Sequence, residues 1–396
     1  MNSFNSSTSS FKASEHQAAG HDGCMTSGSL FIKPATRQEL DFYTETLSRD
    51  DIKEASENGV ALGSLLSHWM PTCLGSLQKR DLSTTEEKKK TLVPSTSKDN
   101  TLISKDKEYI VLSNLYHGFK NPSILDIKLG SKLTDDSVTP EEKIKRLQQV
   151  SESTTSGSHS FRICGMKVYN GKDDVIKPDD LFPGMKDTIT IDSSESMDES
   201  SHSKSSEKYL VYDKIFGRSF NTNTVQQGLE LYFKTIIPNK DHFICLITNF
   251  IHRLQLLYNC LLDYETRSYS ASLLFVYESD PHAWSKVNLG NYQKYDPLIN
   301  EFELSDDDEE DDQSDASESV DTEGLNNVAE AYDIVKQANI DGQDGRKETH
   351  TPLSSLHLID FAHSKYVDGA GYDENIIDGV ENLIKTFQNI QRTYEG

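Results

Sequence analysis

The segment Pro122–Gly130 constrains this chain most strongly, because it fixes two opposite charges on one rigid element. It reads P-x-x-x-D-x-K-x-G, its first half is apolar and β-branched enough to predict a strand, and Gly130 can end that strand. Side chains alternate between the faces of a strand, so Asp126 and Lys128 would point the same way, about 6–7 Å apart. The pair suits a nucleotide sugar or a metal on one side and a phosphate on the other. The alternative is a surface ion pair on an edge strand.

Acidic charge is concentrated in one part of the chain. Residues 301–350 contain 18 Asp and Glu against 3 Lys and Arg, and so carry −15 of the formal net charge of −24. Because the run Asp306–Asp312 repels itself, this segment cannot form a packed core alone. We expect it to be a disordered insertion, as are the polar stretches 79–107 and 186–208, and we expect residues 1–14 to be a disordered N-terminus.

The net charge, the apolar runs and the cysteine spacing of the chain argue against several classes of protein. The acidic balance argues against direct binding of nucleic acid or anionic membranes. No apolar run is long enough for a membrane span, and the Ser-rich start lacks the apolar core of a secretory signal. The five cysteines are scattered without a C-x-x-C pair, which indicates reduced thiols inside a cell. We therefore expect a monomer located in the nucleus and cytoplasm.

Two further segments are similar to parts of a kinase. Leu30–Lys33 predicts a strand that Pro34 stops, and the helical pattern from Glu39 to Leu47 follows it. In kinases a strand lysine holds the nucleotide phosphates and a helix glutamate orients that lysine. Near the other end of the chain, an apolar strand ends at Asp360, where kinases place a Mg²⁺ ligand. Taken singly, a strand lysine is usually solvated and a strand-end Asp usually caps a turn.

A cluster of positive charge follows the Asp126/Lys128 pair. Pro140 and two glutamates begin a predicted helix over 140–150, with Thr139 as a possible N-cap. Five cations fall within 19 residues, and they are Lys128, Lys132, Lys143, Lys145 and Arg146. A solvated helix face is the alternative. A dense set of cations in an otherwise acidic protein is what a polyphosphate substrate requires.

The core is predicted from apolar periodicity. The segment Asp241–Asp263 has apolar residues at helical spacing along one face, which indicates a buried helix with no functional role. Strands are predicted at Tyr109–Leu112, Phe161–Tyr169 and Tyr269–Tyr277, and a helix at Gly379–Phe387.

The motifs of this chain, and the order in which they follow one another, resemble those of the inositol polyphosphate kinase family. The signature is the P-x-x-x-D-x-K-x-G segment, and the supporting motifs are residues 17–23, 161–169, 217–218, 272–278 and 359–363. The chain looks most like the multikinase branch of that family, in its fungal form. The resemblance implies an α+β, two-lobed fold, similar to protein kinases and ATP-grasp enzymes. It would have an ATP-binding N-lobe at 15–117 and a C-lobe at 118–396.

The resemblance also implies roles for individual residues. Lys33, oriented by Glu39, would hold the ATP phosphates, and the linker through Ser113 and Leu115 would meet adenine. Asp126 would bind the ribose hydroxyls, Lys128 would contact the transferred phosphoryl group, and Asp360 would bind Mg²⁺. The inositol phosphate would be held by a larger set of polar residues, which are Lys128, Lys132, Lys145, Arg146, Gln148, Gln149 and His363.

The implied activity is transfer of the γ-phosphoryl group of ATP to inositol tris- and tetrakisphosphate, giving the pentakisphosphate. Two alternatives stay open. The chain could be an inositol hexakisphosphate kinase, or a nuclear regulatory scaffold that binds transcription factors through acidic residues 303–312. It has no G-x-x-x-x-G-K-[ST] loop, which excludes P-loop chemistry, and no H-R-D catalytic loop, which argues against an ordinary protein kinase.

Overall fold

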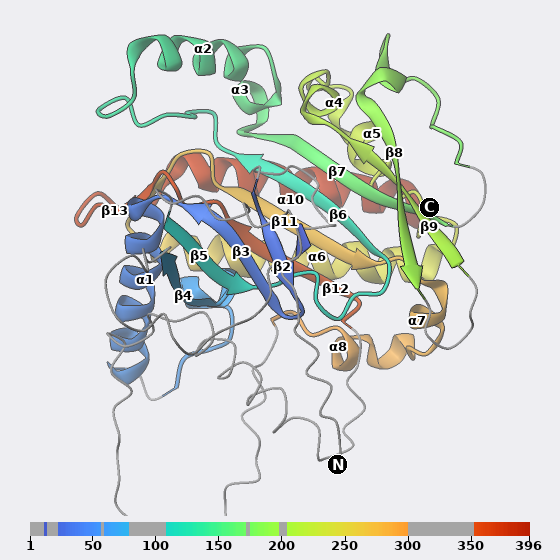
Figure 1. Cartoon of the computed structure of the whole chain (residues 1–396), viewed down its shortest axis with the longest axis horizontal. Coiled ribbons are helices and arrows are strands. Elements are labelled where there is room, and N and C mark those ends of the chain that lie inside the picture. Colours follow the sequence, from blue (N-terminus) through green and yellow to red (C-terminus); the bar gives the residue numbers. More distant parts are fainter. Residues whose placement is uncertain are drawn as a thin grey trace, which may run out of the picture.

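Two antiparallel sheets form the centre of the computed structural model, which describes residues 12–13, 23–56, 59–78, 108–171, 175–197, 204–299 and 352–396. A five-stranded sheet has the order β1-β2-β3-β5-β4, and a six-stranded sheet has the order β12-β11-β6-β7-β9-β8. Figure 1 shows the first sheet in front of the second, with the long helices α6 and α10 behind both. The described residues therefore form an α+β protein, as the sequence predicts.

The five-stranded sheet comes from the first part of the chain. Its strands are β1 (Lys12–Ala13), β2 (Met25–Ser27), β3 (Leu30–Ala35), β4 (Cys73–Gln78) and β5 (Glu108–Ser113). The prediction that Pro34 stops the strand is wrong, because Pro34 pairs with Tyr109 inside β3. On its other side β3 pairs with β2 only at Leu30–Ile32, so Pro34 lies where that edge is open and a missing N–H is tolerated.

Helix α1 (Arg37–Ser56) follows β3 directly and is longer than the predicted stretch from Glu39 to Leu47. Its buried face carries Leu40, Phe42 and Tyr43, and Tyr366 of β13 stacks on Phe42 at a centroid distance of 5.4 Å. Strand β13 (Ser364–Tyr366) pairs with β10 (Thr266–Ser268) in a small third sheet. Helix α1 is thus packed against β13, a strand from the far end of the chain.

The six-stranded sheet contains the other predicted strands, whereas those at Leu30–Lys33 and Tyr109–Leu112 lie in the five-stranded sheet as β3 and β5. These other strands are β6 (Pro122–Leu129), β7 (Phe161–Gly171), β11 (Ser272–Glu278) and β12 (Ser354–Ile359), and β8 (Ile189–Met197) and β9 (Lys204–Tyr212) complete the sheet. The lobe boundary expected at 117/118 falls in the linker between β5 and β6. This linker is the only described connection between β5 and β6, and its residues 114–121 contain no helix or strand.

The prediction of a disordered insertion at 186–208 is wrong for most of its length. Residues 189–197 and 204–212 pair as the β8–β9 hairpin, with Ile189 opposite Tyr212 and Met197 opposite Lys204. The buried part of the hairpin is apolar, and Ile189, Tyr209 and Leu210 are each about 1% exposed. The rest is rich in Ser, Asp and Glu because β8 is an edge strand, so its sequence lacks the apolar alternation that marks a half-buried strand.

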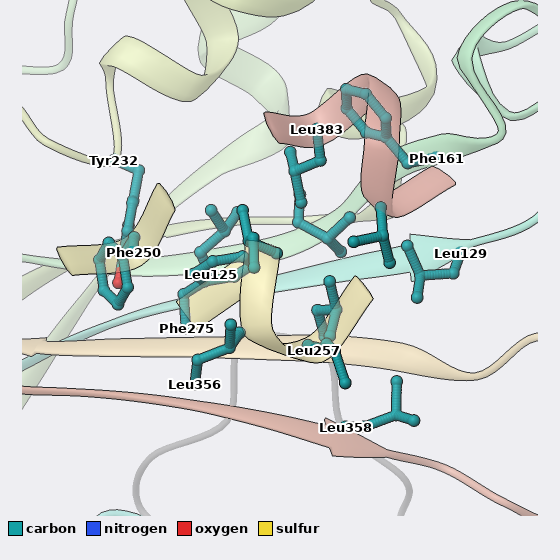
Figure 2. Packing of buried hydrophobic residues seen from close by; sticks show 14 of the residues in the cluster. Leu125, Leu129, Phe161, Tyr232, Phe250, Leu257, Phe275, Leu356, Leu358 and Leu383 are labelled. Carbon is teal, nitrogen blue, oxygen red and sulfur yellow. The ribbon is translucent and has the colours of Figure 1, made fainter. Parts of the chain in front are cut away.

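The core lies between the six-stranded sheet and helices α6 (Lys240–Leu262) and α10 (Glu374–Glu395). Figure 2 shows Leu125 and Leu129 of β6 and Phe275 of β11 directed toward Phe250 and Leu257 of α6 and Leu383 of α10. All six side chains are fully buried, and each contributes about 1.5–3 kcal/mol by leaving water. The predicted core helix is confirmed, and the C-terminal helix is longer than predicted.

The remaining described helices are shorter and lie around the sheets. They are α2 (Glu141–Glu152), α3 (Thr155–His159), α4 (Lys214–Arg218), α5 (Val225–Glu230), α7 (Pro281–Ser285) and α8 (Tyr292–Tyr295). Within the described ranges, no helix is long and apolar enough to cross a membrane. The expected insertions at 79–107 and 301–350 lie outside the described residues, as do the acidic run at 303–312 and most of residues 1–14.

Candidate active site

Strand β6 forms the floor of the candidate site and is an interior strand, not an edge. It pairs with β11 on one side and β7 on the other, and Lys128 lies opposite Ser272 and Arg162. Asp126 is 3% exposed, and the Lys128 ammonium donates to the carbonyl of Ser270 at 2.7 Å. The reading as a surface ion pair is therefore wrong, since both charged groups lie in the protein interior.

Gly130 ends β6 in a conformation that other residues rarely adopt. Its φ is +91°, and a Cβ built there would lie 2.3 Å from the side-chain nitrogen of Asn375. The Asn375 carboxamide accepts from the N–H groups of Ser131 and Lys132 at 2.9 and 2.8 Å. Helix α10 thus fixes the turn that follows Lys128, which explains why the signature ends in glycine.

The predicted ion pair of Lys33 and Glu39 is present. The Lys33 ammonium lies 2.8 Å from the Glu39 carboxylate and 3.2 Å from that of Asp360, and its side chain is 9% exposed. Burial alone would lower the pKa of Lys33, but Asp360 and Glu39 outweigh it, so the pKa lies above its usual value. Lys33 is therefore a permanent cation at the start of the cavity described below.

Asp360 connects the two lysines. Its other carboxylate oxygen lies 3.3 Å from the Lys128 ammonium, and its side chain is 22% exposed. The backbone at Asp360 has φ +68°, a strained conformation for a residue with a side chain. The next residue, Phe361, is fully buried and stacks on Phe42 of α1 at a centroid distance of 4.9 Å. The packing of Phe361 on α1 thus holds the Asp360 carboxylate in place.

Asp126 lies near Lys128 and Asp360, and burial disfavours the charged form of its carboxyl group. Burial raises its pKa to about 6, with Lys128 opposing the shift and Asp360 adding to it. Among the described residues, nothing hydrogen-bonds its Oδ1 atom. A buried carboxylate oxygen without a donor is an acceptor for a ligand hydroxyl, so the site fits a ribose at this position.

The lysines and Asp360 line a cavity of about 720 Å³, which we call the reaction cavity. Predicted site residues in its wall are Lys33, Glu39, Lys128, Asp360 and His363. The wall also includes Thr139, Lys143 and Leu147 from helix α2 and the segment before it, and Tyr269 and Ser270. Burial, followed by the charges of nearby lysines including Lys143, lowers the pKa of His363.

Other predicted substrate contacts do not line the reaction cavity. They are Lys132, Lys145, Arg146, Gln148 and Gln149. Lys145 pairs with Glu141 at 2.6 Å with 69% of its side chain exposed, and Gln148 donates to Glu152 at 2.9 Å. Lys132 pairs with Asp136 and lies 5.7 Å from the ring centre of Tyr269, at the edge of the cavity. Their roles stay predictions.

The N-terminus of α2 also differs from the expectation. The N-cap is Pro140, and no side chain caps the helix, so the predicted cap by Thr139 is wrong. Thr139 instead lines the reaction cavity. Lys143 and Leu147 are one helical turn apart and face the cavity together, which places the predicted face 145–148–149 to one side.

Arg162 is a residue that sequence reasoning missed. It lies on β7 opposite Lys128, is 8% exposed, and donates to Ser156 Oγ at 2.7 Å. Burial lowers its pKa, and nearby Arg218 adds to the effect. The period of two along Phe161–Tyr169 could have placed Arg162 and Cys164 on the face opposite the core residues Phe161 and Ile163.

In the linker that is expected to meet adenine, some backbone N–H groups already donate hydrogen bonds within the protein and one does not. The N–H groups of Ser113 and Asn114 donate to Thr72 and Ser29 at 2.9 and 2.7 Å. Within the described ranges, the N–H of Leu115 has no acceptor. Leu115 packs against a buried apolar patch formed by Ile124, Leu274 and Val276, which is a suitable surface for a base. Ser113 and Leu115 do not line the reaction cavity.

The residues present fit a divalent metal at Asp360. Among the described residues there is no group of three or more carboxylate, His or Cys side chains that could hold a metal alone. A partly exposed carboxylate suits Mg²⁺, which takes one or two protein carboxylates and completes its shell with phosphate oxygens and water. The metal site would therefore form only together with a phosphorylated ligand.

Comparison with known proteins gives consistent results. The family model described as inositol polyphosphate kinase matches residues 109–388. The chain is 36% identical to the inositol polyphosphate multikinase of Saccharomyces cerevisiae over 95% of this chain and 98% of that protein. It is 25% identical to inositol hexakisphosphate kinase 3 of Mus musculus over 44% of this chain and 35% of that protein.

A solved structure is also similar to this chain. It is the inositol phosphate multikinase Ipk2 of S. cerevisiae in complex with ADP and Mn²⁺. The TM-score is 0.55 at 31% identity, and the match covers 92% of this chain and 99% of that one. The two-lobed, kinase-like fold expected from the sequence is confirmed by this match.

Proposed function

The chain belongs to the inositol polyphosphate kinase family, and from this premise we propose that it is an ATP-dependent inositol polyphosphate multikinase. It transfers the γ-phosphoryl group of ATP to hydroxyls of inositol tris- and tetrakisphosphate, giving inositol pentakisphosphate. The similarity to a multikinase extends over nearly the whole of both chains, whereas the match to a hexakisphosphate kinase covers less than half of each. This difference supports multikinase activity over the hexakisphosphate alternative.

One observation carries the proposal: two lysines whose side chains are only 9% and 12% exposed converge on one carboxylate in the wall of the reaction cavity. Lys33 and Lys128 lie 3.2 and 3.3 Å from the two oxygens of Asp360. Charges act more strongly where water is excluded, so two fixed ammonium groups there are suited to polyphosphate chains. A divalent cation bound at Asp360 would neutralise the charge of the phosphates, and we propose that this cation is Mg²⁺.

The chain's own residues act mainly by positioning. Glu39 orients Lys33 toward the ATP phosphates, Asp126 accepts from the ribose hydroxyls, and the N–H of Leu115 donates to adenine over the apolar patch. Lys128 contacts the transferred group and the substrate phosphate. Holding the acceptor hydroxyl in line with the γ-phosphorus converts an encounter of two anions into reaction within one complex. We assign no general base.

The substrate approaches from the α2 side of the reaction cavity. Lys143, His363 and Lys128 face that space, and Lys132 lies at its edge. An inositol phosphate with three or four phosphates repels ATP, so several cations between the two are needed for both to bind. Lys145, Arg146, Gln148 and Gln149 would contribute only to phosphates that extend beyond the cavity.

The test is a turnover assay with labelled ATP and Mg²⁺ in which inositol trisphosphate and inositol hexakisphosphate are offered separately. Conversion of the trisphosphate through tetrakis- to pentakisphosphate is expected. Turnover of the hexakisphosphate alone would move the protein to the pyrophosphate-forming branch. A folded protein that binds ATP but phosphorylates neither compound would refute kinase activity toward inositol phosphates.

We propose a second, regulatory role on the basis of the acidic run. Residues 303–312 contain eight Asp and Glu and lie outside the described residues. Such a run attracts basic surfaces, and we propose that it binds transcription factors in a monomeric protein shared between nucleus and cytoplasm. Co-purification of partners with the full chain, compared with a chain lacking 303–312, tests this role, and equal recovery would refute it.

A further inference from the structure

The two hydrogen-bond partners of the Lys128 ammonium share an unusual backbone conformation. Within the described part of the chain, the ammonium donates to the carbonyl of Ser270 at 2.7 Å and to the carboxylate of Asp360 at 3.3 Å. Both partners are left-handed, with φ of +65° and +68°, and both line the reaction cavity. Among the other described residues apart from glycine, only Ser160 has a positive φ. Backbone strain collects at functional sites, so its presence in both partners of one lysine indicates a role in the reaction.

Ser270 lies where the chain passes from the small third sheet to the six-stranded sheet. The residue before it, Tyr269, donates its N–H to the carbonyl of His363 at 3.2 Å. The carbonyl of the residue after it, Ala271, accepts from the N–H of Leu129 at 2.9 Å, at the end of β6. Hydrogen bonds on both sides therefore fix the backbone around Ser270, and a strained conformation persists only where its surroundings hold it in this way.

The side chain at position 270 adds to this fixation. A glycine would adopt a positive φ without cost, but it would also leave the backbone free to move. The Ser270 hydroxyl instead donates to the carbonyl of Leu133 at 3.1 Å. Leu133 is buried and belongs to the segment that leads from β6 toward α2. The serine thus ties the strained turn to the chain that follows Lys128, and the position of its carbonyl is set on three sides.

The two lysines of the reaction cavity are oriented by different chemistry. Lys33 pairs with the carboxylate of Glu39 at 2.8 Å, so a negative charge that serves no other lysine accompanies it. Lys128 shares the carboxylate of Asp360 with Lys33, and its shorter contact is to a carbonyl, which carries no net charge. An ammonium has three donors, and the described partners of Lys128 take two of them. The carbonyl therefore gives Lys128 a direction without cancelling its charge, and it leaves one N–H for a phosphate.

We propose that Ser270 is a positioning residue for phosphoryl transfer, whose left-handed backbone aims its carbonyl at Lys128 and so directs the ammonium toward the transferred group. The inference deepens the proposed function and rests on it. A cation lowers the barrier only if it stands where negative charge develops, and a flexible lysine stem does not ensure this by itself. The carbonyl of Ser270 supplies the missing constraint, and the strain at Ser270 is the cost of placing it there.

The test is a double-mutant cycle between positions 270 and 128, with kcat of the full chain measured on inositol trisphosphate and labelled ATP. Ser270→Val puts a β-branched side chain at a φ of +65°, which such residues hardly ever adopt, so the carbonyl should turn away from Lys128. We expect kcat to fall by about tenfold in the parent background and by less than about twofold in the Lys128→Met background. A loss of the same factor in both backgrounds would indicate a general structural defect and would overturn the proposal.

A rescue variant and a matched control separate positioning from strain. Ser270→Gly adopts a positive φ without strain and should bring kcat back to within about threefold of the parent, whereas a loss as large as that of Ser270→Val would refute the role of the backbone. Ser160→Val applies the same strain at φ +53°, outside the wall of the reaction cavity. Whatever loss it causes should be equal in the parent and Lys128→Met backgrounds. Coupling to Lys128 as strong as that of Ser270→Val would show that any strained serine has this effect, and would also refute the proposal.

The parent enzyme in the same assay separates this inference from the proposed function. A parent that does not phosphorylate inositol trisphosphate would refute both. Turnover by the parent, together with losses at positions 270 and 128 that simply multiply, would refute only the role of Ser270. If Ser270→Val does not fold, Ser270→Thr replaces it in the cycle with the same expected coupling, because threonine is also β-branched but keeps a hydroxyl for the carbonyl of Leu133.

Discussion

Strand β6 and helix α2 both carry charged residues toward the reaction cavity, but they are held very differently. Strand β6 lies between two other strands, Asp126 is 3% exposed, and Lys128 is paired with Asp360. In α2 only Ser151 is buried, and the Lys145 side chain is 69% exposed. Figure 1 shows α2 and α3 standing away from the two sheets, next to the end of β7.

The difference indicates how one protein could phosphorylate several substrates. The groups proposed to hold ATP are fixed by packing and by each other, so the reacting phosphorus has one position. The groups proposed to hold the inositol phosphate lie on an exposed helix, where side chains can move between phosphates at low cost. Substitutions should therefore be severe on β6 and at Asp360, which follows β12, and mild on α2.

The largest effect is expected for Asp360→Asn. The change keeps the shape but removes the charge that pairs with Lys33 and Lys128 and the proposed metal ligand. We expect kcat to fall by about 10³-fold. Asp368→Asn, an exposed carboxylate that pairs with Arg49 of α1, is the control and should stay within about twofold. Equal losses in both variants would remove Asp360 from the site.

A smaller loss is expected for Lys128→Met. The methionine fills a similar volume but cannot contact the transferred group, so kcat/KM should fall by about 10²-fold. Initial rates with inositol trisphosphate measure this effect. Lys385→Met on α10, which breaks an exposed pair with Glu381, should leave the rate unchanged. A Lys128→Met enzyme with normal kcat/KM would contradict the role given to the strand pair.

On helix α2 the effect of a substitution should depend on which face of the helix the residue lies on. Lys143 lines the reaction cavity and Lys145 does not, so Lys143→Ala should raise KM for inositol trisphosphate by about tenfold with little change in kcat. Lys145→Ala should change KM by less than about twofold, because its exposed pair with Glu141 contributes little. The reverse order would show that the helix face predicted from the sequence, through Lys145, is the one that binds substrate.

The smallest effect on catalysis is expected for deletion of residues 303–312. Because these residues are proposed to bind partners and not substrate, kcat/KM with inositol trisphosphate should stay within about twofold of the full chain. A parallel assay at low and physiological salt checks whether the acidic run competes with substrate for the cations. A tenfold rate change at either salt concentration would place the run near the reaction cavity.

The strand pair was predictable because local rules decide it. The period of two puts Asp126 and Lys128 on one face, a glycine follows, and Lys33 and Glu39 are brought together by a strand that leads directly into a helix. The apolar stripe of α6 was equally clear. In each case a few neighbouring residues determine the outcome, and the later packing only reinforces it.

Other features depend on distant residues and could not be predicted from the sequence. Which face of α2 meets the cavity depends on how the segment after Gly130 is held by Asn375 of α10. The β8–β9 hairpin is polar because β8 is an edge strand, and Pro34 is tolerated because β2 is short. The position of Arg162 beside Lys128 needs the pairing of β6 with β7.

The most direct test of a site built on a buried carboxylate with one unsatisfied oxygen is the stability and turnover of Asp126→Asn. The pKa of Asp126 is raised to about 6, against about 3.9 in an unfolded chain, so between these values the folded state binds more protons. Stability therefore falls as pH rises from about 4 to 6, and the full penalty is present above pH 6.

At pH 7.5 we predict that Asp126→Asn is more stable than the parent protein, by up to roughly 3 kcal/mol in urea unfolding, while turnover falls by at least about 10²-fold. The gain in stability should disappear below about pH 4, where both forms are neutral. A variant that is less stable at pH 7.5, or one that keeps full turnover, would contradict the claim that this carboxylate is buried for catalysis at the expense of the fold.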